Sequence, residues 1–224
     1  MISQEAALLL STGLFLGIRH AFDRDHVAAV THFVSMEPDP LKSAWFGCRW
    51  AMGHAVMVLV FGSLILAFHL KFDPTFQAYA ELLVGVSLVA LGCWRLLLLW
   101  QERQHEHRHA HPDKAHTHLH THEPGREHVH WLAPTLVGML HGAAGTVEIF
   151  VLIPITLIAT VWLAYAYIAL FSLGCAASMS GYGYLAGRFY SKATRMGRRV
   201  YRMLVILTCV SGLILGAAWI AKNL

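Results

Sequence analysis

Hydrophobic residues along the chain form long runs that are separated by short polar or charged stretches. Two of the runs, 81–100 and 203–221, match the roughly 20 residues that a helix needs to cross a hydrocarbon core about 30 Å thick. Because backbone groups inside lipid must pair within their own segment, we expect the spans to be helices. The pattern predicts an all-α polytopic membrane protein with six spans, roughly at residues 5–27, 44–69, 77–101, 132–159, 162–187 and 201–222.

The two halves of the chain carry related sequences, which predicts an internal repeat. Residues 17–20 (GIRH) align with 138–141 (GMLH), and 36 residues after each first glycine stand Gly53 and Gly174. Each half then holds three spans, and an odd number reverses the orientation of the second half, as in the inverted repeats of many secondary transporters. The alternative is that short apolar matches arise by chance among membrane helices.

This repeat divides the chain into three units. We expect a first three-helix repeat over residues 1–101, a loop over 102–131 and a second three-helix repeat over 132–224. A further match between the repeats, shifted slightly, aligns residues 86–92 with 210–216.

The distribution of basic residues predicts the orientation. Fifteen of the seventeen lysines and arginines flank the first, third and fifth connections, and only Lys71 and Lys222 fall on the other side. The positive-inside rule therefore places both termini outside and the long third connection in the cytoplasm, with the chain in the cytoplasmic (inner) membrane. No basic residue precedes Arg19, so we expect the first apolar run to be a retained span rather than a cleaved signal.

Composition excludes several classes of function. The chain is 56% hydrophobic and 13% charged, with a mean hydropathy of +0.51, which is not typical of a soluble enzyme. Its net charge of +4 is explained by the membrane topology, so we expect the lipid bilayer rather than nucleic acid as a partner. The four cysteines show no CxxC spacing, so neither a disulfide framework nor a zinc knuckle is predicted.

The densest group of ionisable residues inside a predicted span lies at residues 19–26, RHAFDRDH. Ionisable groups are rare within a bilayer and are functional candidates by default. Two imidazoles and two carboxylates suit divalent nickel, cobalt or zinc. On a continuous helix His20, Asp23 and His26 share one face, whereas Asp25 points away, so either Asp25 is not a direct ligand or the helix breaks here. The alternative is a charge cluster at the lipid headgroups.

Three further polar residues extend this candidate site to other spans. His54 and His141 are each placed near mid-depth, in opposite repeats, which favours one shared site over separate structural hydrogen bonds. Glu148 follows His141 by seven residues, on the same helix face, and could be a ligand, a proton carrier or a partner for an arginine. His32 and His69 lie near span ends and are interpreted as interface residues, and Pro154 is expected to kink its helix.

The connection between the two halves is rich in histidine and poor in apolar residues. Its alternating pattern, with interspersed proline and glycine, cannot form a core and predicts a metal-binding tract. The alternative is a low-complexity linker that binds metal incidentally. The tract comprises His105, His107, His109, His111, His116, His118, His120, His122, His128 and His130.

At these residues the sequence resembles the nickel/cobalt permease family, including its urease-associated and NicO-type branches. The family signature R-H-A-x-D-x-D-H matches residues 19–26, its Gly-His pair matches Gly53-His54, and its Thr-x-Glu and His-Gly-x-x-Gly patterns match residues 146–148 and 141–145. The chain departs from it at Arg24, often small or apolar in relatives, and at Ala144, an aspartate in longer ones. The resemblance implies a membrane permease for Ni²⁺ or Co²⁺ that needs the first-span motif.

We therefore expect a secondary transporter rather than an enzyme, without a resident cofactor. Its ion is nickel or cobalt, with zinc as a further candidate, and no Walker motif is present to power pumping. The candidate metal ligands are His20, Asp23, Asp25, His26, His54, His141 and Glu148. Uptake is favoured over export by proton exchange, in which the histidine tract would collect cytoplasmic metal. A membrane metalloenzyme and a metal-sensing subunit are alternatives of other classes, and a homo-oligomer or a metallochaperone contact stays open.

Overall fold

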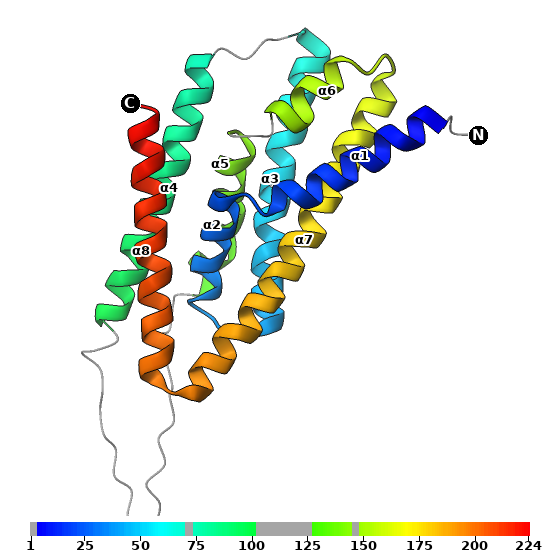
Figure 1. Ribbon diagram of the computed structural model, residues 1–224. Helices are drawn as coiled ribbons and strands as arrows, with labels where there is room; N and C mark the ends of the chain where they lie inside the picture. The colour runs from blue at the N-terminus through cyan, green and yellow to red at the C-terminus, as the bar shows by residue number, and fades with distance from the viewer. Residues whose placement is uncertain (1–3, 70–73, 102–126, 145–147) are drawn as a thin grey trace, which may run out of the picture.

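A computed structural model describes residues 4–69, 74–101, 127–144 and 148–224 of the chain (Figure 1). The first half contains α1 (Gln4–Ala21), α2 (Arg24–Val34), α3 (Pro40–Phe68) and α4 (Pro74–Gln101). The second half contains α5 (Glu127–Gly142), the π-helical turn η1 (Glu148–Leu152), α6 (Ile153–Thr156), α7 (Val161–Met196) and α8 (Arg198–Lys222). These ranges hold no strand, so the predicted all-α class is confirmed.

Four of these helices, α3, α4, α7 and α8, are long and apolar enough to cross a membrane within the described part of the chain. They correspond to the predicted spans 44–69, 77–101, 162–187 and 201–222, although α7 continues to Met196. Figure 1 shows them forming an elongated bundle with both termini at its upper end and with the α2–α3 and α7–α8 connections at its lower end. The six-span arrangement stays a prediction.

The first predicted span, 5–27, is interrupted rather than continuous. Helix α1 ends at Ala21, where the amides of Phe22 and Asp23 bond to the carbonyls of Arg19 and His20 at 3.1 and 3.0 Å. Asp23 is extended (φ −61°, ψ 146°) and precedes α2, which continues the chain to Val34. The charged motif therefore occupies a break inside the bundle, and the first connection begins only after α2.

The fourth predicted span, 132–159, is also divided. Helix α5 ends at Gly142, and the chain resumes at η1 and the short α6, whose first turn contains Pro154. Proline has no amide hydrogen and clashes with the preceding turn, so it is best tolerated in the first turn of a helix, which is where Pro154 stands in α6. The hydroxyl of Tyr167 in α7 donates to the carbonyl of Phe150 at 2.8 Å and so satisfies a backbone group in the π-helical turn. Pro154 stands where η1 passes into α6, so the division of the span after Gly142 lies before it, and the kink expected at Pro154 stays a prediction.

Glycines allow the helices of the two halves to cross at backbone contact. A methyl group at Gly17 in α1 would overlap the carbonyl oxygen of Phe171 in α7, and one at Gly138 in α5 would overlap that of Trp50 in α3. Gly17 and Gly138 are partners in the sequence repeat. So are Trp50 and Phe171, which stand three residues before Gly53 and Gly174. The two crossings are therefore reciprocal.

A second pair of crossings follows the same rule. Gly53 packs against the backbone of Thr135 and Met139 in α5, whereas Gly174 packs against that of Leu14 and Ile18 in α1. Between α4 and α8, a methyl group at Gly92 would approach the carbonyl oxygen of Cys209 to 3.2 Å, and one at Gly216 would approach that of Gly85 to 2.7 Å. Each of these contacts made by one half has a counterpart in the other, at the spacing of the sequence repeat.

Replacing Gly138 by alanine should destabilise the protein, because its new methyl group would meet the Trp50 carbonyl of a packed helix, which cannot give way as a side chain can. We expect a loss of about 3 kcal/mol or more in the free energy of unfolding. The measurement is the thermal unfolding midpoint in detergent, read by intrinsic fluorescence. Gly181→Ala is the matched control, because nothing lies within 4 Å of its methyl position. Equal midpoints for the two variants would contradict the close crossing.

Candidate metal centre

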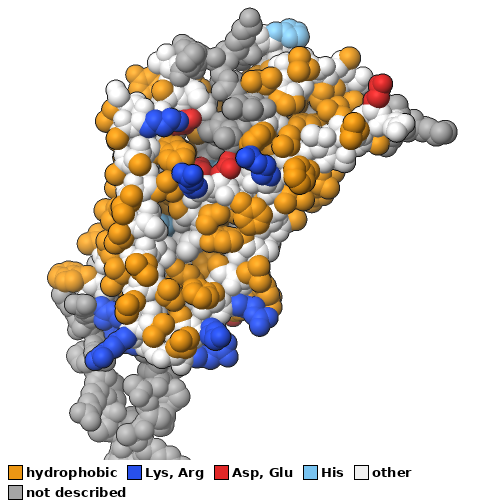
Figure 2. All heavy atoms as spheres, viewed as in Figure 1, with side chains coloured by type: hydrophobic (Ala, Val, Ile, Leu, Met, Phe, Trp, Pro, Cys, Tyr) orange, Lys and Arg blue, Asp and Glu red, His pale blue; other side chains and the backbone are white. Residues whose placement is uncertain are grey.

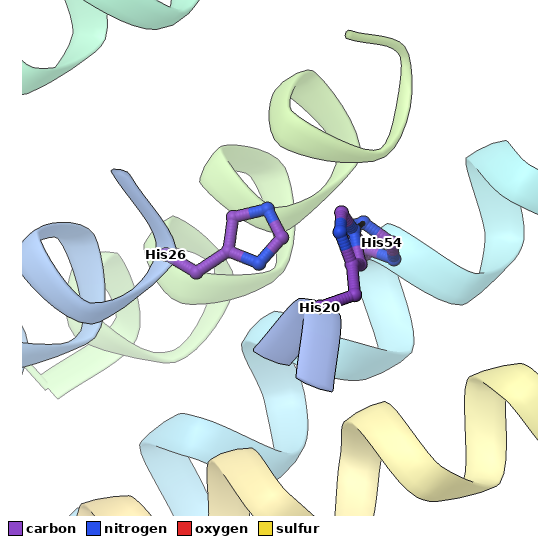
Figure 3. A group of neighbouring side chains, drawn as sticks. All are labelled: His20, His26 and His54. Carbon is purple, nitrogen blue, oxygen red and sulfur yellow. Dashed lines mark hydrogen bonds between the residues drawn. The ribbon is translucent and has the colours of Figure 1, made fainter. Parts of the chain in front are cut away.

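Three histidines from three helices meet inside the bundle. His20 stands in the last turn of α1, His26 in the first turn of α2 and His54 at the middle of α3. All three are buried, and one ring nitrogen of each lies within 4.8 Å of the others. Figure 3 shows the rings of His20 and His54 together, with that of His26 facing them. The break between α1 and α2 brings His20 and His26 to this point from two helix ends.

The ring of His20 is oriented by the carboxylate of Asp23. The two groups are joined at Nδ1 by a 3.0 Å hydrogen bond, and the opposite nitrogen, Nε2, lies 3.1 Å from the Nε2 of His54. Metal-binding imidazoles usually donate their second N–H to a carboxylate or a backbone carbonyl, which fixes the tautomer and the ring orientation. Asp23 is therefore placed as an orienting partner of His20. Two ring nitrogens at this separation fit a single ion bound to both.

His141 adds a fourth imidazole from the second half of the chain. Its Nδ1 donates to the Val137 carbonyl at 2.8 Å, so its Nε2 carries the lone pair. That Nε2 has no hydrogen-bond partner among the described residues and lies 3.9 Å from the carboxylate of Asp25. The same carboxylate oxygen lies 3.6 Å from the Nε2 of His26. Asp25 therefore faces the cluster because the helix breaks, which resolves the alternative left open by the sequence.

Aromatic side chains form the walls of the cluster. The indole of Trp50 stacks on His54 with 5.3 Å between ring centroids, and its centroid lies 4.5 Å from that of His26 and 5.5 Å from that of His141. Phe171 lies 5.2 Å from His20. Neither residue was predicted from the sequence, although Trp50 stands one helical turn before His54. That spacing alone would have placed it on the same face.

The carboxylates lie between the cluster and the molecular surface. The Asp23 side chain is 27% exposed and that of Asp25 is 13% exposed, whereas the histidines are buried. Figure 2 shows acidic side chains between basic ones on the face where α1 meets α2. The guanidinium carbon of Arg19 lies 5.1 Å from the centroid of the Phe150 ring, and this cation–π contact fixes the position of the arginine's positive charge. A cation reaching the histidines from this face would meet oxygen donors first.

The remaining predicted residues are not all placed with this group. Glu148 begins η1, but its side chain is outside the described structure, as are those of His128 and His130 at the start of α5. The tract residues from His105 to His122 lie outside the described ranges. His32 is a correction: it was expected at the interface, but it is fully buried against Gly212 of α8. His69 is exposed at the end of α3, as expected of an interface residue.

Comparison with known proteins gives one curated relative. The chain is 29% identical over 187 residues to the urease accessory protein UreH of Bacillus sp. (strain TB-90), and the alignment covers 84% of this chain and 79% of that protein. The predicted resemblance to the urease-associated branch is thereby confirmed. No family model and no solved structure matches the chain.

Removing any one of His20, His26 or His54 should weaken binding of nickel to the purified protein by more than the roughly 10- to 100-fold that loss of an outer partner costs. Asp23→Asn should have a smaller effect within that range, because it alters only the orientation of His20. The measurement is equilibrium dialysis with Ni²⁺ in detergent, with every variant made in a background whose ten tract histidines are replaced by asparagine, so that the tract does not contribute to the binding. His69→Asn is the control: it removes an exposed histidine and retains a residue type that tolerates its left-handed backbone. Unchanged affinity in the three alanine variants would exclude this metal centre.

Proposed function

We propose that the chain is a secondary transporter that carries divalent nickel or cobalt across the cytoplasmic membrane, with uptake as its direction. The observation that carries this proposal is the convergence of His20, His26 and His54 from three helices at a helix break inside a bundle of apolar helices. Interrupted helices are a common way for transporters to present groups to an ion within the membrane. The relationship to a urease accessory protein supports a metal as the cargo.

The donor set favours first-row divalent ions. Imidazole nitrogens suit nickel, cobalt, zinc and copper, whereas carboxylates alone would select magnesium or calcium. The nearby carboxylates of Asp23 and Asp25 can balance the two positive charges of one such ion. Metal–nitrogen bonds are about 2.0–2.1 Å long. An ion bound to all three histidines would therefore bring together those ring nitrogens that lie up to 4.8 Å apart in this structure. We propose His20, His26 and His54 as direct ligands, with Asp25 and His141 completing the shell.

We further propose that the chain is built as two inverted three-helix repeats. The reciprocal crossings of Gly17 with Phe171 and of Gly138 with Trp50 support it, because a two-fold relation between the halves requires such exchange. The divided first helix of each half is a second common feature. In this arrangement both termini lie outside, and the histidine tract lies in the cytoplasm.

The membrane potential favours uptake as the direction. When one positive charge moves inward across a membrane potential of 100 mV, its free energy falls by about 2.3 kcal/mol. The free energy of a divalent cation therefore falls by about 4.6 kcal/mol. Uptake can therefore run on the membrane potential alone, whereas export requires exchange for another ion such as the proton. The alternative function, export of nickel or cobalt, would use the histidine tract as the cytoplasmic collector.

Cells that produce the protein should accumulate nickel or cobalt when the metal is supplied at trace levels, and cells that produce His26→Ala should not. Total cellular nickel, cobalt, zinc, manganese and iron are measured by mass spectrometry. The His69→Asn variant serves as the matched control and should accumulate metal as the unaltered protein does. A fall in cellular metal with increased tolerance would show export, and no difference for any metal would exclude transport.

Replacing the eight tract histidines from His105 to His122 by asparagine should alter transport without abolishing it, because the proposed site lies within the helices. We expect the initial rate of nickel entry into proteoliposomes to change by less than about tenfold, which is below the roughly 10- to 100-fold cost of losing an outer metal partner, because the tract is not part of the proposed ligand set. A complete loss of entry, with membrane insertion unaffected, would favour a sensor or chaperone that depends on the tract. Absence of flux in the unaltered protein, together with a metal-dependent reaction, would favour a metalloenzyme.

A further inference from the structure

The C-terminal end of α2 is held by two side chains from other helices. The carbonyl oxygen of Ser35, the residue that follows α2, accepts a hydrogen bond of 2.7 Å from the hydroxyl of Tyr201 in α8. It accepts another of 3.1 Å from Nη2 of Arg95 in α4, and that nitrogen lies 3.2 Å from the Tyr201 oxygen. We call these contacts between Ser35, Arg95 and Tyr201 the α2 latch.

The α2 latch buries a charge inside the bundle. Arg95 is 2% exposed, and an arginine at such a position needs hydrogen-bond acceptors to offset the loss of water. The last carbonyls of a helix lack partners within the helix and carry the negative end of its dipole. The end of α2 therefore supplies what Arg95 requires, and Arg95 stabilises α2 in this position.

Helix α2 links the latch to the candidate metal centre. It is only 11 residues long, about 16 Å at 1.5 Å per residue, and Asp25 and His26 stand in its first turn. A helix this short moves as one rigid piece. Any displacement of its C-terminal end therefore displaces two of the residues that surround the proposed ion.

The surroundings of the latch also close the bundle below the metal centre. The His32 ring, in the last turn of α2, fills the space beside Gly212 so completely that a methyl group there would overlap it. The buried positive charge of Arg95 lies at the Ser35 carbonyl, three residues after His32, where it would oppose passage of a cation toward the lower end of the bundle. In the proposed topology this lower end faces the cytoplasm.

We propose that Arg95 and Tyr201 are positioning residues that form the inner gate of the transporter, which opens when α2 leaves the Ser35 contact and His32 leaves Gly212. This inference rests on the proposed function. Metal bound at the cluster pulls on the first turn of α2 and favours the open latch, so that the ion can leave toward the cytoplasm.

The test uses Cys209 as a native reporter. This thiol is fully buried, lies one turn before Gly212 in α8 and interacts electrostatically with Arg95. With Cys48, Cys93 and Cys175 replaced by alanine, the rate at which a water-soluble maleimide labels Cys209 in proteoliposomes reports opening. Tyr201→Phe removes one hydroxyl from the latch and should raise this rate about 2- to 10-fold, the effect of one lost hydrogen bond. Arg95→Lys should also raise it.

Tyr190→Phe is the matched control. The Tyr190 hydroxyl bonds to Thr208 of α8, so this variant loses a buried tyrosine hydroxyl beside Tyr201 and keeps the hydrogen bonds of the α2 latch. It should leave the labelling rate within about twofold of the background. Equal rates for Tyr201→Phe and the background, or equal acceleration by Tyr190→Phe, would overturn the gate.

Nickel separates this inference from the proposed function. Saturating Ni²⁺ should accelerate labelling in the background protein, half-maximally at the nickel concentration that half-fills the site, and the effect should vanish in His26→Ala. Nickel that binds without changing the rate would overturn the gate and leave the proposed metal site intact. Absence of nickel binding would overturn the proposed function, and with it the coupling of the latch to metal, even if Tyr201→Phe labels faster.

Discussion

Backbone groups that leave a helix inside a membrane bundle must find partners, because lipid offers none, and the chain meets this constraint between Ala21 and Arg24. The amides of Phe22 and Asp23 turn back to α1, and the Asp23 carbonyl starts α2 by accepting the amide of Val27 at 3.0 Å. The Asp23 carboxylate does not cap α2; it binds the His20 ring instead. One residue thus ends a helix, begins another and orients a candidate ligand, and the other features of the site depend on this break.

Close helix crossings bring the other residues of the cluster to the break between α1 and α2. The Gly17 crossing brings α7 against α1 one turn before His20, and the Gly138 crossing brings α5 against α3 one turn before His54. These contacts place His54 and His141 beside the ends of α1 and α2, with Trp50 packed among their rings. Larger residues at these glycines would separate the helices and widen the cluster beyond the reach of one ion. The architecture and the histidine cluster therefore depend on the same small residues.

Local sequence patterns predicted which residues meet inside the bundle better than they predicted the path of the chain. The spacing of His20, Asp23 and His26, together with the repeat, identified residues that do meet, because ionisable groups are rare in apolar segments and stand out. The same patterns predicted that the first span runs as one helix to residue 27 and that the fourth span is continuous. Hydropathy averages over a window, so it cannot register a break that is stabilised by a few hydrogen bonds. Trp50 was missed, His32 was assigned to the interface and Arg95 was counted only as a flank of the third connection, all for a related reason: their roles depend on tertiary contacts, which composition does not encode.

The break also arranges helix dipoles around the proposed ion. Helix α1 directs its negative C-terminal end at the cluster, which favours a cation, whereas α2 directs its positive N-terminal end there, which opposes one. Asp23 and Asp25 stand at that N-terminal end, where carboxylates are stabilised by the dipole and offset its effect on the ion. At the other end of α2 the guanidinium of Arg95 meets the Ser35 carbonyl. Both ends of α2 are thus stabilised by charges of the sign that complements the helix dipole. A cation that arrives at the first turn of α2 competes with the positive end of this dipole for the carboxylates of Asp23 and Asp25. Binding of metal therefore weakens the electrostatic hold on one end of α2, which is the physical reason why occupancy of the cluster and release of the latch can be coupled.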